Sequence, residues 1–106
     1  MLDHNVDDAY INMVLDTSLN KTMKKDNICV VYTPQHGTGY YFVTTVLKKQ
    51  GYKVVEVKEQ CNPSEDFANT LSPNPEEKVA YEKALKYAID SDADLICCTD
   101  PDCDRV

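Results

Sequence analysis

Apolar residues recur along the chain with a helical period first and a strand period next. Ile11, Val14 and Leu15 follow one another at intervals of three and four, which places them on one face of a helix. Acidic residues near the start of this segment and lysines near its end suit the helix dipole. The pattern predicts a helix over residues 7–25.

The middle of the chain, residues 28–57, is predicted to form a strand, a helix and a second strand. Residues 28–33 form a continuous β-prone run, which is typical of a strand buried on both faces. A loop over 34–39 then leads into a helix from Tyr40 to about Gln50, with Gly51 as its stop. Residues 52–57 alternate and predict a second strand.

A polar loop over 58–72 separates this unit from a third helix. Asn74 can cap that helix, Pro75 suits its first turn, and Glu77 occupies the capping-box position. We expect the helix to run to about Asp90. Its candidate core residues are Val79, Leu85, Ala88 and Ile89. Ala93 to Thr99 then predicts a third buried strand.

The alternation of helices and strands predicts an α/β fold, a three-layer α/β/α arrangement with a small, mainly parallel sheet. Ligands of such folds gather beyond the carboxyl ends of the strands. Two loops fall there, residues 36–39 after the first strand and residues 100–105 after the last.

Composition limits the classes of function. A chain of 106 residues is expected to form a single domain, residues 1–106, and its formal charge of −7 argues against a nucleic-acid partner. We find neither an apolar run of about 20 residues nor a signal peptide, so we expect a cytoplasmic protein without a membrane partner. Its five cysteines include no C-x-x-C pair, which favours reduced thiols over a zinc site.

The loop after the last predicted strand carries the clearest chemistry. Asp100, Asp102 and Asp104 are spaced by two, and carboxylates so close together repel one another unless a cation lies between them. Mg²⁺ takes oxygen ligands, and Arg105 adds a planar cation suited to a phosphate oxygen. The alternative is an ordinary acidic turn, because Asp and Pro are common turn residues.

Other readings of this loop fit less well. An EF-hand requires Gly at its sixth position, where this chain has Arg105. Hydrolases that form an aspartyl-phosphate also place D-x-D after a buried strand, with Asp100 as the nucleophile here, but Asp104 stands where they usually have Thr or Val. That hydrolase and a non-catalytic divalent-cation-binding regulatory module stay open as alternatives.

The loop after the first strand is the second candidate. Gly37 and Gly39 let backbone amides approach an anion, and His36 and Thr38 lie where they could touch a substrate. A tight strand-to-helix turn with a hydrogen-bonded His36 explains the same residues, so both readings stay open.

Residues 100–105, Asp-Pro-Asp-Cys-Asp-Arg, resemble the metal-binding loop of the α-D-phosphohexomutases, the phosphoglucomutase and phosphomannomutase family. Residues 31–39 resemble the start of the second domain of that family, and residues 72–77 resemble a third segment between the two. The resemblance covers residues 28–106, preceded by a consistent but undiagnostic leading segment, 1–27.

The resemblance implies a function. Asp100, Asp102 and Asp104 would bind Mg²⁺, and Arg105 would help to place the phosphate of a phosphoserine that exchanges its phosphoryl group with a hexose phosphate. The Ser-His-Asn-Pro nucleophile segment of the family is missing, so no nucleophile lies in this chain. We therefore expect a second domain cut from a longer enzyme, partnered by the other domains of the same polypeptide and inactive alone.

Overall fold

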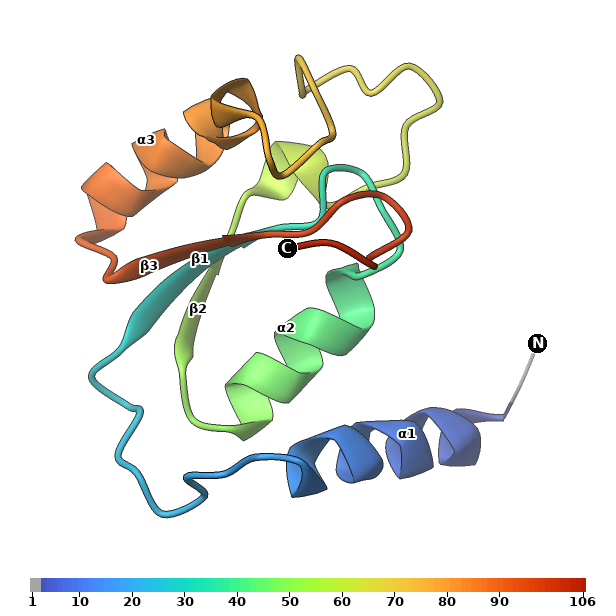
Figure 1. The fold of residues 1–106 in the computed structure, drawn as a ribbon, viewed down its shortest axis with the longest axis vertical. Helices are drawn as coiled ribbons and strands as arrows, with labels where there is room; N and C mark the ends of the chain where they lie inside the picture. Colours follow the sequence, from blue (N-terminus) through green and yellow to red (C-terminus); the bar gives the residue numbers. More distant parts are fainter. Residues whose placement is uncertain (1–2) are drawn as a thin grey trace.

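The computed structural model describes residues 3–106 and shows the expected alternation of helices and strands (Figure 1). The elements are α1 (His4–Asp16), β1 (Cys29–Thr33), α2 (Tyr40–Lys49), β2 (Lys53–Glu56), the 3₁₀ turns η1 (Lys58–Gln60) and η2 (Lys78–Tyr81), α3 (Glu82–Ser91) and β3 (Leu95–Cys98). The predicted small α/β/α fold with a parallel sheet is confirmed.

The sheet has three parallel strands in the order β2-β1-β3. All five residues of β1 are buried, as its continuous apolar run predicts for a central strand. Thr33 at the end of β1 lies opposite Cys98 at the end of β3. The loops that follow these two strands therefore leave the sheet side by side.

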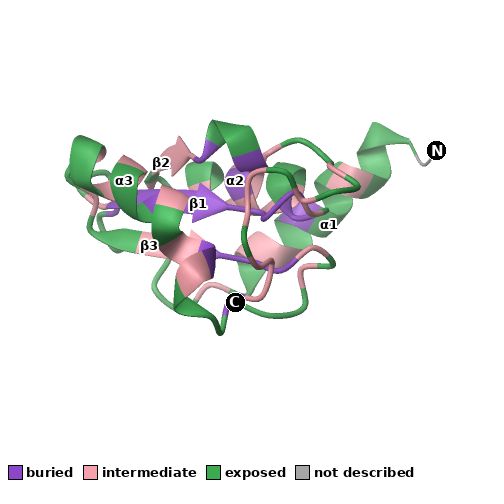
Figure 2. Cartoon of the chain, turned by 90° about the horizontal axis from the view of Figure 1, so that it is seen from above, coloured by how far each residue is buried: buried purple, intermediate pink, exposed green. Residues whose placement is uncertain are grey.

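Helices cover the two faces of the sheet. α3 packs on one face, where buried Ala84 joins Val31 and Val57 in the core, and α2 lies on the opposite side (Figure 1). Buried residues concentrate in β1 and continue into the segment beyond its end (Figure 2). Tyr87 and Ala88 of α3 pack against this core as partly buried residues.

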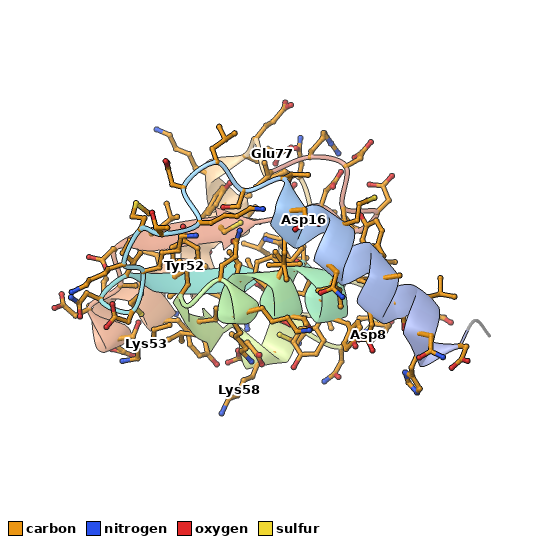
Figure 3. All side chains as sticks on the ribbon, turned by 90° about the horizontal axis from the view of Figure 1, so that it is seen from below. Asp8, Asp16, Tyr52, Lys53, Lys58 and Glu77 are labelled. Atoms are coloured by element: carbon orange, nitrogen blue, oxygen red, sulfur yellow. The ribbon has the colours of Figure 1, made fainter. Side chains whose placement is uncertain are left out.

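The first helix is shorter than predicted. α1 ends at Asp16, and only turns lead from there to β1. Beyond Leu15 the apolar stripe has no continuation, because Ser18 is polar and Leu19 is 96% exposed. Lys25, predicted as part of the helix, is buried with its Nζ 5.6 Å from the ring centroid of Tyr52. Figure 3 shows α1 from the side of the molecule that also carries α2.

The start of the third helix was also predicted wrongly. Asn74 caps a turn and not a helix, because its Oδ1 accepts the N–H of Glu76 at 3.0 Å and its carbonyl accepts the N–H of Glu77 at 3.1 Å. The chain forms η2 next and becomes α-helical at Glu82.

Two predicted core residues of this helix lie at the surface. Leu85 is 52% exposed and Ile89 is 72% exposed, because the side of α3 that faces the core carries Ala84 and the partly buried Ala88 instead. β3 is likewise an edge strand and not a strand buried on both faces, with Leu95 56% exposed.

Across residues 3–106, every helix falls short of the length and apolar character that crossing a bilayer requires.

Candidate metal and phosphate site

The acidic loop folds back on itself directly after β3. The N–H of Cys103 donates to the carbonyl of Asp100 at 3.0 Å, and Cys103 adopts a φ of 63°. This turn brings one carboxylate oxygen each of Asp100, Asp102 and Asp104 within 4.8 Å of one another. The spacing of the three aspartates predicts that they are neighbours, and the backbone turn brings them together.

Asp100 organises the loop from inside. Its side chain is only 2% exposed, its Oδ1 accepts the backbone N–H groups of Asp104 at 3.1 Å and Arg105 at 3.0 Å, and its Oδ2 accepts the Nε–H of Arg105 at 2.9 Å. Burial by itself would raise the pKa of Asp100, but these hydrogen bonds, led by those of Arg105, hold it below the ordinary value. Asp100 is therefore an anion at neutral pH.

The other two carboxylates face solvent. Asp102 and Asp104 are exposed, and the pKa of Asp104 is raised by the adjoining carboxyl of Asp100 and then by the charge of Asp102. Three carboxylates are thus held closer than their mutual repulsion favours. A bound divalent cation would remove this repulsion, and oxygen donors of this kind are those that Mg²⁺ and Ca²⁺ prefer.

The loop after β1 is packed against the acidic loop. Thr38 donates its N–H to the carbonyl of Pro101 at 2.8 Å, and a Cβ on Gly37 would overlap the backbone of Pro101. A Cβ on Gly39 would come within 2.6 Å of the hydroxyl of Tyr32 and within 2.8 Å of Sγ of Cys103 in the acidic loop. The two glycines therefore permit the close approach of the two loops. Contact of residues 36–39 with a substrate stays a prediction.

His36 fastens the long loop over residues 58–72. Its Nδ1 donates to the carbonyl of Asn62 at 2.6 Å, and its Nε2 accepts the N–H of Asn69 at 3.2 Å. These bonds require the neutral ring with the proton on Nδ1. The side chain is buried and has a structural use here, while its role toward a substrate stays a prediction.

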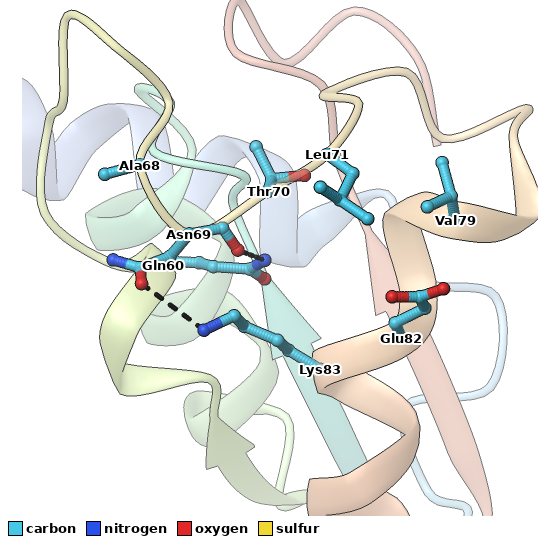
Figure 4. A pocket seen from close by; sticks show the side chains of 8 residues that line it. All are labelled: Gln60, Ala68, Asn69, Thr70, Leu71, Val79, Glu82 and Lys83. Atoms are coloured by element: carbon cyan, nitrogen blue, oxygen red, sulfur yellow. Dashed lines mark hydrogen bonds between the residues drawn. The ribbon is translucent and has the colours of Figure 1, made fainter.

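Polar residues outside the predicted site support the same loop, residues 58–72. Gln60 accepts from the hydroxyl of Thr33 at 2.6 Å and donates through Nε2 to the carbonyl of Asn69 at 2.6 Å. Asn69 also accepts from Lys83 at 3.3 Å (Figure 4). A cavity of about 120 Å³ lies between this loop and α3. No motif marks Gln60, which is found only through its contacts.

Asn74, predicted to cap a helix, contacts the acidic loop instead. Its Oδ1 accepts the Nη1–H of Arg105 at 3.2 Å, which ties segment 72–77 to the acidic loop. The Asn-Pro dipeptide was the available signal, because it favours turns as readily as helix starts.

The same residues lie inside a recognised domain. A family model described as phosphoglucomutase/phosphomannomutase, alpha/beta/alpha domain II, matches residues 8–106. The chain belongs to this family. The match includes the acidic loop, the loop after β1 and segment 72–77, which are the three segments on which the resemblance was based.

Curated proteins with three different names are similar to this chain, and each is a good deal longer than the chain. It is 40% identical over 106 residues to a phosphoglucomutase of Staphylococcus haemolyticus, covering 99% of this chain and 19% of the relative. It is 36% identical over 93 residues to a phosphomannomutase of Mycoplasmoides pirum, covering 87% of this chain and 16% of the relative. A phosphoribomutase of Saccharomyces cerevisiae is 41% identical over 80 residues, which are 71% of this chain and 13% of the relative.

The chain thus spans less than a fifth of the length of these curated relatives. No solved structure matches it.

Proposed function

We propose that this chain is the Mg²⁺-binding domain of a phosphoglucomutase/phosphomannomutase that interconverts hexose 1- and 6-phosphates through a phosphoserine on another domain. The observation that carries the proposal is the cluster of three carboxylate oxygens within 4.8 Å, beside Arg105, in a member of this family. The different names of the relatives leave the sugar unassigned.

Asp100, Asp102 and Asp104 would hold the cation. Oxygens bound to one Mg²⁺ at about 2.1 Å lie roughly 3 to 4 Å apart, so the separation of up to 4.8 Å needs only a small closure of the loop. When bound, Mg²⁺ would neutralise negative charge on a phosphoryl group. We expect the isolated chain to bind Mg²⁺ weakly, because the phosphoserine oxygen that would complete the site is on another domain.

Arg105 would act on the phosphate directly. Its side chain is 49% exposed, carries a permanent charge, and lies next to the carboxylates at the rim of the loop. Phosphoryl transfer depends on positioning and charge neutralisation, and a fixed cation at this place supplies both. Residues 36–39, packed against the acidic loop, would form part of the substrate surface.

The proposed partners of this chain are the other domains of the same polypeptide and the hexose phosphate. The chain holds no Ser-His-Asn-Pro segment, so the proposed nucleophile comes from another domain of the same polypeptide, and the hexose phosphate lies between them. The isolated chain is then inactive. The hydrolase alternative has little support, because the Asp100 side chain is buried and both of its oxygens accept hydrogen bonds.

Turnover of the full-length protein tests the proposal. We expect conversion of glucose 1-phosphate or mannose 1-phosphate to the 6-phosphate with Mg²⁺, and loss of activity with a chelator. Asp102→Asn should lower kcat about 100-fold or more at an unchanged melting temperature, since the side chain is exposed and the loop is held by Asp100. Asp8→Asn, an exposed carboxylate on α1, is the matched control and should have full activity.

Absence of mutase activity toward both sugars would reject the proposal. Full activity of Asp102→Asn would instead remove Asp102 from the set of metal ligands and leave the family reaction standing.

A further inference from the structure

The side-chain oxygen of Asn74 is a fixed acceptor with two donors. It receives the N–H of Glu76 at 3.0 Å from its own turn and the Nη1–H of Arg105 at 3.2 Å from the acidic loop. The next residue, Pro75, is buried, and its carbonyl accepts the hydroxyl of Tyr81 at 2.9 Å. The oxygen is therefore held in place by segment 72–77, independently of Arg105.

The guanidinium of Arg105 is held at two of its three nitrogens. Nε donates to Asp100 at 2.9 Å and Nη1 donates to Asn74 at 3.2 Å. A planar group anchored at two nitrogens has its plane fixed, whereas one anchored at Nε alone can swing about its side-chain bonds. Within residues 3–106, Nη2 donates no hydrogen bond, so it is the nitrogen left for a ligand.

We propose that Asn74 is a positioning residue that fixes the guanidinium of Arg105, so that Nη2 faces a phosphate oxygen of the ligand bound at the acidic loop. A neutral amide oxygen suits this role, because it orients the cation without cancelling the charge that attracts phosphate. The phosphate part of the proposal rests on the proposed function. The anchoring of Arg105 by Asn74 does not.

A double-mutant cycle in the full-length enzyme measures whether Asn74 acts through Arg105. We expect Asn74→Ala to lower kcat about 10-fold, in line with the loss of orientation of a charged donor. Asn74→Asp keeps an acceptor for both donors and should recover part of that loss. In an Arg105→Ala background, Asn74→Ala should not lower kcat further. If Asn74 had a general structural role instead, the two losses of kcat would multiply in the double variant, and this result would overturn the proposal.

Glu77→Ala is the matched control, since this exposed side chain adjoins the same turn and makes no cap hydrogen bond. It should have the activity of the unmodified enzyme. A 10-fold loss in this control would show that any change in the turn is harmful and would count against a specific role of Asn74.

A second measurement does not depend on activity. Nitrogen-15 NMR of this chain should show slow rotation of the Arg105 guanidinium, and Asn74→Ala should make it fast while Glu77→Ala leaves it slow. Equally fast rotation in all three proteins would overturn the anchoring. If the full-length enzyme lacked mutase activity, the proposed function would fail, and this experiment would still decide whether Asn74 positions Arg105.

Discussion

The carboxylate of Asp100 accepts two hydrogen bonds from Arg105, one from its backbone N–H at 3.0 Å to Oδ1 and one from its Nε–H at 2.9 Å to Oδ2. The carboxylate is buried at the end of β3, so it gains these bonds in place of water. The pair closes the acidic loop and sets where Asp102 and Asp104 project. Asp100 is therefore a candidate cation ligand that also determines the shape of the loop.

Asp100→Asn should lower the melting temperature of the chain by roughly 4–8 °C. An amide nitrogen in place of one carboxylate oxygen would face an N–H donor of Arg105, and the remaining oxygen would carry less charge. Thermal unfolding followed by circular dichroism measures the change. Asp102→Asn is the comparison, because its exposed side chain should leave the melting temperature unchanged; equal melting temperatures for both variants would contradict the role given to Asp100.

Gly37→Ala should displace the acidic loop. The added Cβ would overlap Cα and the carbonyl group of Pro101, and these backbone atoms have no freedom to rotate away. We expect a loss of about 1–3 kcal/mol in the free energy of unfolding, measured with denaturant, and shifted amide NMR signals over residues 100–105.

Gly51→Ala separates this clash from a general cost of losing glycine. Gly51 has a φ of +99°, and a Cβ there would meet only the Cβ of Lys25 in an ordinary contact at 3.9 Å, so alanine should cost about 1 kcal/mol through backbone strain alone. The signals of residues 100–105 should not move in this variant. Shifts of the same size in both variants would argue against the close packing of the two loops.

The position of the candidate site in the fold could be predicted from the sequence, because the apolar patterns of single helices and strands are enough to predict their order. The buried run of β1 and the order of elements imply a parallel sheet, and a parallel sheet places the loops after Thr33 and Thr99 on one edge. The need for glycine at position 37 could not be predicted from the sequence. It arises from the packing of this loop on the acidic loop, where the contact between Thr38 and Pro101 joins residues 63 positions apart. Such contacts leave no periodic trace in the chain.

The errors at the third helix have a local cause. Asn74, Pro75 and Glu77 satisfy the rules for a helix start, but the same Asn-Pro pair also forms a turn whose oxygen binds Arg105. Leu85 and Ile89 were expected in the core because they are large and apolar, yet both are more than half exposed. The helix instead buries Ala84 and packs Tyr87 and Ala88 against the core, so a second face carries the exposed Leu85 and Ile89.

His36→Ala should loosen the loop over residues 58–72. The variant leaves the carbonyl of Asn62 and the N–H of Asn69 without the ring that bonds both, at a cost of about 1–3 kcal/mol in the free energy of unfolding. Hydrogen exchange at the Asn69 amide should become faster, while exchange in β1 changes only with global stability. His4 is an exposed histidine on α1, so His4→Ala should change neither the stability nor the exchange rate. Slow exchange at Asn69 in His36→Ala would contradict the role of His36 in holding the loop.

Cys61 should resist alkylation at neutral pH. Burial, and then the charges of Glu56 and Glu59, raise the pKa of its thiol to about 11, and the thiol donates to the carbonyl of Val57 at 3.3 Å. Thiolate is the reactive form, so the rate of iodoacetamide labelling at Cys61, followed by mass spectrometry, should rise about tenfold per pH unit above pH 8. Labelling at pH 8 as fast as that of an unfolded peptide would contradict the raised pKa.

The same shift makes stability depend on pH. Because the folded pKa is raised above the unfolded value of about 8.5, the contribution of the neutral thiol is complete below that pH. It is lost progressively as pH rises toward 11. Cys61→Ser removes this titration, so the difference in free energy of unfolding between the two proteins should be constant below pH 8 and should move in favour of the serine variant above it. A constant difference across the whole range would show that Cys61 is not shielded in the folded chain.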